Sequence, residues 1–163
     1  MIRPLAAHDR VPLRELLAAT GCFTAPEMAI AEELIDAVLT HAEQPDYHGF
    51  VYSSGERAVG LVIIGPVPAT IGTWHLYWIA VHPHQHGTGV AAALAAHAES
   101  FVREHDGYLI MVETSSQPAY VRARSFYAKH GYAELLRIAD YYKPGDDLVL
   151  FARRLTPGPV TRG

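Results

Sequence analysis

The stretch that decides the fold is Leu76–Arg103, LYWIAVHPHQHGTGVAAALAAHAESFVR. It opens with the uninterrupted apolar and aromatic run Leu76–Val81, which is typical of a strand buried on both faces. Pro83 ends this run, because proline cannot donate a hydrogen bond to a central ladder. A short turn with two glycines follows, and from Val90 onward the apolar residues recur at helical spacing. The stretch therefore predicts a strand, a glycine turn and a helix in succession.

The glycine turn, with Gly87 and Gly89, lies where a phosphate can bind. The first N–H groups of a helix have no intrahelical acceptor, and the helix dipole favours an anion there. Glycine lets the backbone approach a phosphate without a Cβ in the way. Taken alone, a flexible turn before a buried helix explains the same residues. The turn is not a Walker A loop, since no Gly-Lys-Ser/Thr follows, and Ala92 replaces the third glycine of the dinucleotide fingerprint.

Composition indicates a globular protein of one domain, since the 163 residues are half hydrophobic with a net charge of −4. We expect residues 1–155 to form this domain and residues 156–163, rich in proline and glycine, to be a disordered tail. The chain lacks a basic run, which argues against a nucleic-acid partner. A single cysteine, Cys22, excludes an intramolecular disulfide. Neither a signal core nor a membrane-length apolar run is present, so we expect a cytoplasmic protein without a membrane partner.

The remaining elements follow from the same periodicities. Asp9 is expected to cap a helix over 10–20, and Thr24 with Glu27 has the pattern of a capping box for a helix that runs to His41. We expect strands at 1–5, 50–52, 58–64, 73–81, 108–112, 132–138 and 148–153, and a last helix at 121–130 that ends before Gly131. Residues 140–147 should form a turn-rich hairpin tip. The strands at 73–81 and 108–112, joined by a helix, should be parallel with a right-handed crossover.

Two segments resemble the conserved motifs of a known family. His86–Ala91, after a strand that ends Ala-Val-His-Pro, resembles motif A of the GCN5-related N-acetyltransferases (GNAT), although His86 stands where that motif has arginine or glutamine. Ala123–Tyr132 resembles motif B, with alanine, three residues, tyrosine, and then glycine before an aromatic residue. Tyr120 stands where that motif often has asparagine. The order and spacing of the motifs are similar to a bacterial branch of the family.

The resemblance implies an α+β fold. The family has a mixed, mostly antiparallel sheet of about seven strands, flanked by four helices, with a central parallel pair splayed at a β-bulge, here near Ile79–Val81. It also implies acetyl-CoA as the co-substrate and direct attack of an amine on the thioester in a ternary complex. The residues expected to bind acetyl-CoA are Ile79, Ala80, Val81, His84, Gln85, His86, Gly87, Thr88, Gly89, Val90, Ala91, Ser125 and Tyr127.

The resemblance also suggests the reacting groups. Tyr127 matches the general acid that protonates the departing thiolate. Without the resemblance, a tyrosine near a helix end is more often a core residue than a catalytic one. Glu113, at the end of a strand, is the first candidate for the general base, and its alternative is a solvated carboxylate. His75 and Tyr77 are the next candidates for the base. The residues expected to line the acceptor site are Glu113, Tyr141, Tyr142, His75 and Tyr77, with the helix from Thr24 to His41 as a further wall.

Three histidines, His82, His84 and His86, alternate, but the turn would scatter them, so we predict no metal site. The predicted function is acetylation of a primary amine of a small molecule or a peptide. One alternative is a protein N-terminal acetyltransferase, because the Tyr141–Pro144 tip is similar to the two-tyrosine hairpin of bacterial ribosomal-protein acetyltransferases. Another is a non-catalytic acyl-CoA-binding sensor, since two motif positions depart from the family pattern. Edge strands of such a sheet also allow a homodimer.

Overall fold

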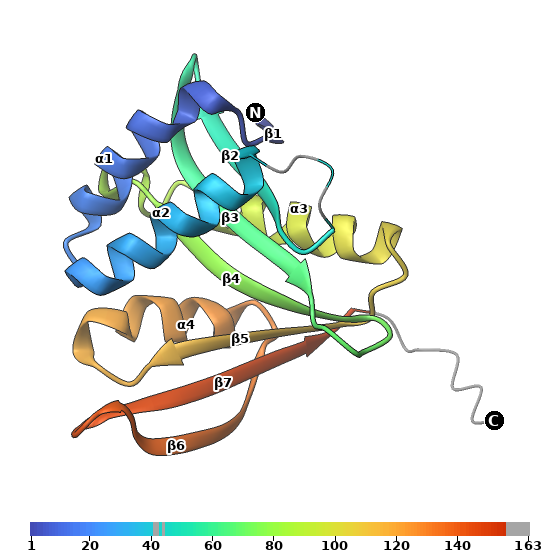
Figure 1. Cartoon of the computed structure of the whole chain (residues 1–163). Helices are drawn as coiled ribbons and strands as arrows, with labels where there is room; N and C mark the ends of the chain where they lie inside the picture. Colours follow the sequence, from blue (N-terminus) through green and yellow to red (C-terminus); the bar gives the residue numbers. More distant parts are fainter. Residues whose placement is uncertain (41–42, 44, 156–163) are drawn as a thin grey trace. The chain divides into compact units, whose positions relative to one another are not determined.

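The computed structural model describes residues 1–40, 43 and 45–155. Seven strands form one sheet in the order β1-β2-β3-β4-β5-β7-β6 (Figure 1). The strands β4 and β5 are parallel, whereas β1–β2, β2–β3, β5–β7 and β6–β7 are antiparallel pairs. This confirms the predicted mixed, mostly antiparallel sheet. The strands are β1 (Ile2–Pro4), β2 (His48–Ser54), β3 (Arg57–Pro66), β4 (Thr73–Val81), β5 (Leu109–Ser115), β6 (Ala133–Lys143) and β7 (Asp146–Arg154).

Within the described residues there are four α-helices, as predicted: α1 (Arg10–Thr20), α2 (Ala25–Thr40), α3 (Val90–Glu104) and α4 (Val121–Lys129). The predicted capping box of α2 is formed, because the Thr24 N–H donates to Glu27 Oε2 at 2.6 Å and the Glu27 N–H donates to Thr24 Oγ1 at 3.4 Å. The predicted helix end at His41 and the predicted tail at 156–163 lie outside the described residues. No helix in the described ranges has the length and apolar character needed to span a bilayer.

The chain divides into two compact units. The first contains Met1–Pro66 and Leu76–Ala98, and the second contains Val67–His75 and the chain from Glu99 onward. The strand β4 therefore supplies its first three residues to the second unit and the rest to the first. The expectation of a single domain over residues 1–155 stays a prediction.

In the first unit, helices α1 and α2 lie on one face of β2 and β3 (Figure 1). The start of α3 packs on the other face, where a Cβ added to Gly60 would come within 2.8 Å of the Leu94 side chain and 2.9 Å of the Val90 side chain. This close contact fixes the beginning of α3 directly against β3. The core between α1, α2 and the sheet includes Leu13, Leu16, Leu17, Ile35, Val51, Leu61 and Ile63, all at most 2 % exposed.

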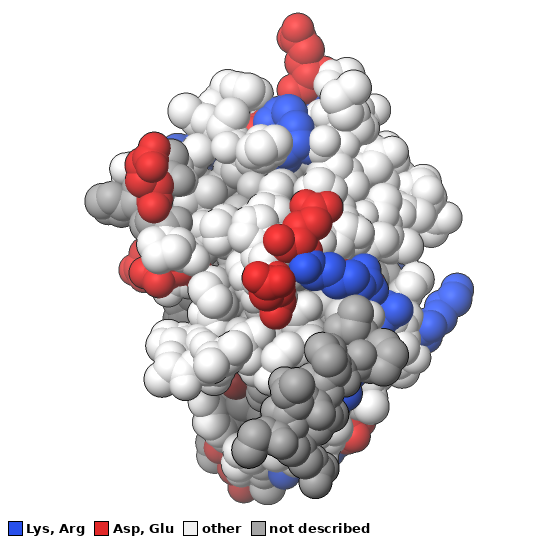
Figure 2. Space-filling view, turned by 90° about the vertical axis from the view of Figure 1, so that its right-hand side faces the viewer, with Lys and Arg blue, Asp and Glu red and all other residues white. Residues whose placement is uncertain are grey.

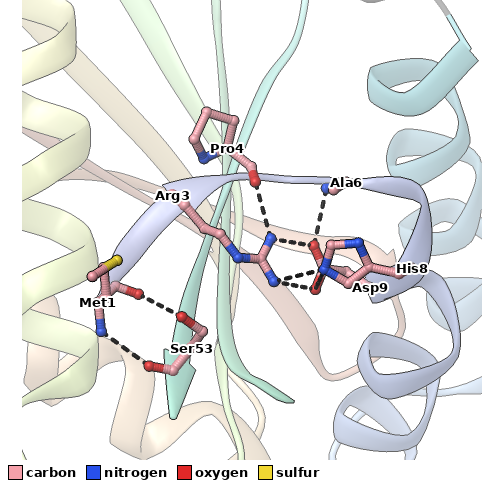
Figure 3. A network of polar contacts seen from close by, with 7 residues as sticks. All are labelled: Met1, Arg3, Pro4, Ala6, His8, Asp9 and Ser53. Carbon is pink, nitrogen blue, oxygen red and sulfur yellow. Dashed lines mark hydrogen bonds and ion pairs between the residues drawn. The ribbon is translucent and has the colours of Figure 1, made fainter. Parts of the chain in front are cut away.

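Asp9 occupies the predicted N-cap position of helix α1, but its side chain makes no cap hydrogen bond. Its carboxylate is fully buried and accepts hydrogen bonds from the Arg3 guanidinium at 2.6 and 2.7 Å and from the Ala6 N–H at 2.9 Å (Figure 3). A buried carboxylate needs a charged partner, and Arg3 on β1 supplies it. The chain forms the short 3-10 turn Ala7–Asp9 before α1, so this carboxylate ties the first strand to the first helix.

In the second unit, helix α4 covers one face of the strands β5, β7 and β6. On β5 the even-numbered residues Ile110 and Val112 are buried on this face, because Val112 pairs with Phe151, whose ring lies 5.6 Å from the ring of Tyr127 on α4. The odd-numbered residues, including Met111 and Glu113, lie on the opposite face. The sheet of this unit therefore has one face under α4 and one face away from it.

The pairing of the two parallel strands is short. It joins Thr73–His75 to Leu109–Met111, while β4 continues to Val81 and β5 to Ser115. Further along β4, the neighbours Tyr77 and Trp78 both pack against the core of the first unit. Consecutive residues of a regular strand point to opposite faces, so two neighbours that contact the same core cluster are in keeping with an irregular strand here. The β-bulge expected near Ile79–Val81 stays a prediction.

Candidate functional site

The loop between β4 and α3 is folded on itself by backbone hydrogen bonds. The N–H groups of Gln85, His86 and Thr88 each donate to the carbonyl three residues earlier, at 2.8, 3.1 and 3.3 Å. The His84 N–H donates to the His82 ring at 3.3 Å. These four N–H groups already have acceptors within the loop. The sequence predicts acetyl-CoA binding by all residues from His84 to Ala91.

The remaining amides of the loop are available to a ligand. Among the residues that the structure describes, the N–H groups of Gly87, Gly89, Val90 and Ala91 have no hydrogen-bond acceptor. Gly87 and Gly89 have φ angles of 78° and 88°, in the left-handed region that favours glycine. Both glycines are exposed, and α3 begins at Val90 with the positive end of its dipole. These four amides are the ones in the loop that can donate to an added acceptor.

His86, which departs from the motif A pattern, has a structural contact. Its Nε2 lies 3.1 Å from the carbonyl oxygen of Val81, so the ring ties the loop to the last residue of β4. The rings of His82 and His84 stack at 5.1 Å. In the described ranges, no group of three histidine, cysteine or acidic side chains is placed to hold a metal ion.

Tyr127 lies near the end of α4, and its side chain is 4 % exposed. Its ring lies 5.8 Å from Phe126, 5.7 Å from Tyr132 and 5.6 Å from Phe151. Burial raises the pKa of the Tyr127 hydroxyl above its ordinary value. The phenol therefore stays protonated at physiological pH, which is the state that a general acid needs.

A buried polar network that sequence reasoning missed lies beside this tyrosine. The Tyr132 hydroxyl donates to Glu99 Oε1 at 3.2 Å, and the Arg153 guanidinium donates to the same oxygen and to the His130 carbonyl, both at 2.8 Å. Glu99 lies in the apolar pattern of α3, and a glutamate in that pattern is the signal that could have identified it. The network fixes the C-terminal end of α4 to β7 and so holds the segment that carries Tyr127.

His75 and Glu113 lie on the same face of the second unit's sheet. His75 pairs with Met111 on β5, and cross-strand partners share a face, so Glu113, two residues beyond Met111, lies on the His75 side. Burial lowers the pKa of His75, and the negative charge of Glu113 partly offsets this. The structure therefore brings together two predicted acceptor-site residues, a half-buried imidazole and an exposed carboxylate.

The β6–β7 hairpin is tied to the end of β5. The Ser115 hydroxyl donates to the buried Asp146 carboxylate, the Asp147 N–H donates to Ser116 Oγ at 2.8 Å, and the Gln117 amide donates to the Gly145 carbonyl. These contacts fix the hairpin close to the segment that follows Glu113. Other carboxylates of the hairpin serve its own turn, since Asp140 Oδ1 accepts from the Gly145 N–H and Asp147 Oδ1 accepts from the Asp140 N–H.

Tyr141 and Tyr142 lie within strand β6, not in a turn as predicted. The strand reaches Lys143 and β7 begins at Asp146, so only two residues form the turn. The two rings lie 5.0 Å apart, edge to face, and are 54 % and 46 % exposed. They form an exposed aromatic pair on the β6 strand of the hairpin.

The other predicted site residues lie in both units. Ile79, Ala80 and Val81 end β4 in the first unit, where the Tyr77 ring packs against Tyr47 at 5.3 Å. Ser125 lies exposed on α4 in the second unit, where it lines a shallow pocket of about 290 Å³ with Arg124, Arg137 and Glu134. On the face that Figure 2 presents, most of the surface is uncharged, and acidic and basic side chains are interspersed.

The chain is similar to known acetyltransferases in sequence and structure. Residues 14–132 match the acetyltransferase (GNAT) family. A crystal structure from Desulfovibrio desulfuricans, assigned to the GNAT family, shares 33% identity and a TM-score of 0.91, with 96% of this chain and 99% of that chain covered. The search of curated proteins gave no match.

Two more distant structures share the fold. The ribosomal-protein-S18-alanine N-acetyltransferase from Escherichia coli has a TM-score of 0.77 at 17% identity, with 99% of this chain and 97% of that chain covered. The aminoglycoside 6'-N-acetyltransferase from Enterococcus faecium also has a TM-score of 0.77 at 17% identity, with 98% and 99% covered. At this identity the two structures support the fold alone.

Proposed function

Because the chain belongs to the acetyltransferase (GNAT) family, whose members are N-acetyltransferases that use acetyl-CoA, we propose that it acetylates a primary amine of a small molecule or a peptide. The amine attacks the thioester directly in a ternary complex. The observation that carries this proposal is the set of four unengaged amides at Gly87, Gly89, Val90 and Ala91 before α3. They would hold the pyrophosphate of acetyl-CoA.

The thioester would lie along the end of β4, beside Ile79, Ala80 and Val81. When the amine attacks, the carbonyl oxygen becomes an oxyanion that needs an N–H donor. A β-bulge leaves a backbone group outside the ladder, and the packing of the neighbours Tyr77 and Trp78 against one core cluster supports a bulge, and so such a donor, in this part of the strand. One oxyanion donor contributes about 10²–10³-fold in rate.

Tyr127 would protonate the sulfur as the carbon–sulfur bond breaks. A cysteine-like thiol has a pKa of about 8.5 in water, below that of a phenol. Burial raises the pKa of Tyr127, and exclusion of water would raise that of the thiolate in the same direction. Exclusion of water thus shifts both pKa values upward, and Tyr127 regains its proton from solvent after product release.

Glu113, with His75 on the same face, would accept the proton of the acceptor ammonium. A lysine-like amine has a pKa of about 10.4 and is mostly protonated at neutral pH, whereas an α-amine titrates near 7.7–8.0. A general base therefore matters most for a lysine-like acceptor amine. Glu113 takes the first proton of the ammonium, and the second leaves the nitrogen to solvent as the tetrahedral intermediate collapses, which balances the proton that Tyr127 gives to the thiolate and regains from solvent. The reaction thus converts an ammonium and acetyl-CoA into an amide, CoA and one released proton.

A second candidate is a protein N-terminal acetyltransferase. The exposed pair Tyr141 and Tyr142 favours it, because two adjacent aromatic rings offer a surface to an extended peptide. The third candidate, a sensor that binds acyl-CoA without catalysis, rested on His86 and Tyr120. His86 now has a structural contact with Val81, which removes one reason for it.

The experiment that tests the proposal measures CoA release from acetyl-CoA with and without a panel of small amines, amino acids and peptides. We expect release that depends on the amine, with one acetylated product for each CoA. Tight acetyl-CoA binding without release for any amine would support the sensor. Turnover limited to peptides with a free N-terminus would support the second candidate.

A further inference from the structure

The sheet face away from α4 carries an apolar stripe next to Glu113. The pairing of the antiparallel strands sets Glu113 of β5 beside Leu150 of β7, and Leu150 beside Leu136 of β6. Neighbouring strands lie about 4.8 Å apart, so this row extends roughly 10 Å from the carboxylate to Leu136. A row of one charged and two apolar side chains thus crosses three strands.

A parallel row lies one step further along the strands. Ser115 pairs with Leu148, and Leu148 pairs with Ile138 of β6. Leu136 and Ile138 are 43 % and 47 % exposed, so this part of the stripe is open to a ligand. The polar side chains of the same strand, Glu134 and Arg137, pair with Phe151 and Val149 and therefore lie on the α4 side.

The carboxylates near the stripe favour a ligand with one positive charge. In the described part of the hairpin, each of the three aspartates at 140, 146 and 147 already accepts a hydrogen bond from a neighbouring N–H or hydroxyl. Glu113 is exposed beside the half-buried His75, whose pKa is lowered by burial. One carboxylate at the end of an apolar stripe complements an ammonium group attached to an apolar body.

We propose that the acceptor is a monoamine with an alkyl or aryl group. This inference rests on the proposed acetyl transfer and names its substrate class. The ammonium binds at Glu113, and the apolar part lies over Leu150 and Leu136 toward the Tyr141–Tyr142 pair. Polycationic amines bind less well, because the stripe beyond Glu113 offers them no second free carboxylate among the described residues and desolvates their charges.

The test measures kcat/KM for the unbranched primary amines from ethylamine to octylamine, with saturating acetyl-CoA and the full chain. A methylene that leaves water contributes about fourfold in affinity, and partial burial reduces this, so we expect a rise of two- to fourfold per methylene. Leu136→Ser should flatten this dependence, because it lowers kcat/KM more for octylamine than for ethylamine. Val121→Ser is the control, since Val121 is also an exposed apolar residue (55 %, against 43 % for Leu136), lies on α4, and should keep the wild-type slope.

Several outcomes overturn the inference. A kcat/KM that is independent of chain length, or higher for a polyamine such as spermidine than for hexylamine, contradicts the substrate class while leaving acetyl transfer intact. A Leu136→Ser variant that changes the oligomeric state in size-exclusion chromatography, with an unchanged slope, makes the stripe an interface between two copies of the chain. Absence of CoA release with every amine contradicts both the inference and the proposed function.

Discussion

The rings of Tyr127 and Phe151 lie 5.6 Å apart, with Tyr127 on helix α4 and Phe151 on strand β7. This packing fixes the ring of Tyr127 independently of its hydroxyl, so the Tyr127→Phe variant should keep the fold and lose only the proton donor. We expect kcat to fall by about 10²–10⁴-fold, the usual contribution of a general acid. Acetyl-CoA affinity and the melting temperature should change little. Near-wild-type kcat, with chemistry shown to limit the rate, would return Tyr127 to a structural role.

The glycine turn offers a matched pair of variants. Gly89 and Gly55 both have positive φ angles, and a Cβ added to either would meet nothing within 4 Å. The Gly89→Asp variant places a negative charge at the proposed phosphate site, whereas Gly55→Asp places it in the β2–β3 turn of the same unit, outside the glycine turn. Calorimetry should show CoA affinity at least tenfold weaker for Gly89→Asp and unchanged for Gly55→Asp. Equal affinities in the two folded variants would remove the phosphate assignment.

His75 and Glu113 give a prediction that does not depend on turnover. The negative charge of Glu113 raises the pKa of His75, while burial, the larger effect, lowers it. Glu113→Gln removes this charge and should lower the pKa of His75 further. An NMR titration of the His75 ring in both proteins measures this change. An unchanged His75 pKa would show that the two side chains do not interact and would leave Glu113 without a partner for its proposed role.

The aromatic pair on β6 should contribute to acceptor binding. Tyr141 and Tyr142 are both about half exposed, so replacing both by alanine should leave stability nearly unchanged. We expect the KM for the acceptor to rise about tenfold, while the dissociation constant of acetyl-CoA stays at the wild-type value. Steady-state kinetics with the best amine of the panel measures the first quantity, and calorimetry measures the second. If acceptor KM were unchanged, the pair would be a structural part of the hairpin.

The buried ion pair of Arg3 and Asp9 should dominate the pH dependence of the first unit's stability (Figure 3). Burial acts to raise the pKa of Asp9, but the hydrogen bonds from Arg3 and Ala6 and the charge of Arg3 hold it below its usual value. This stabilisation is therefore present above the unfolded pKa of about 4 and is lost as pH falls through the lower folded pKa. Asp9→Asn should lower the free energy of unfolding by about 3 kcal/mol at pH 7.

A surface pair provides the control. Arg57 and Glu15 form an ion pair at 2.7 Å, with both side chains more than half exposed. Glu15→Gln should therefore cost less than about 1 kcal/mol. Urea denaturation of both variants at pH 7 and pH 3 measures these differences. An equal loss in the two variants would contradict the role assigned to Asp9.

The sequence predicts what is local in this fold. The apolar run of β4, the glycine turn and the periodicity of α3 follow from neighbouring residues, and the capping box of Thr24 and Glu27 forms as its spacing indicates. What the sequence does not predict depends on partners far along the chain. Asp9 is buried because Arg3 of β1 reaches it, and Glu99 is buried because Arg153 of β7 pairs with it.

The residues of the candidate site also fall into those that follow from local sequence and those that depend on distant parts of the chain. The candidates Gly89 and Tyr127 follow from the resemblance of two short segments to the motifs of the family. The stripe from Glu113 to Leu136 depends on the register of three strands, and β6 has an irregularity between Glu134 and Leu136 that no pattern of apolar residues reveals. A one-residue change in register would place Leu136 on the α4 side, so this surface could be recognised only from the structure.

The most direct test of the central claim follows CoA release and product mass together. The full chain is mixed with acetyl-CoA and hexylamine, free thiol is titrated over time, and the amine is analysed by mass spectrometry. Our account predicts CoA release that requires the amine, one N-acetylhexylamine for each CoA, and a rate at least a hundredfold lower in the Tyr127→Phe variant. Release of CoA at the same slow rate with and without any amine, and no acetylated product, would contradict it.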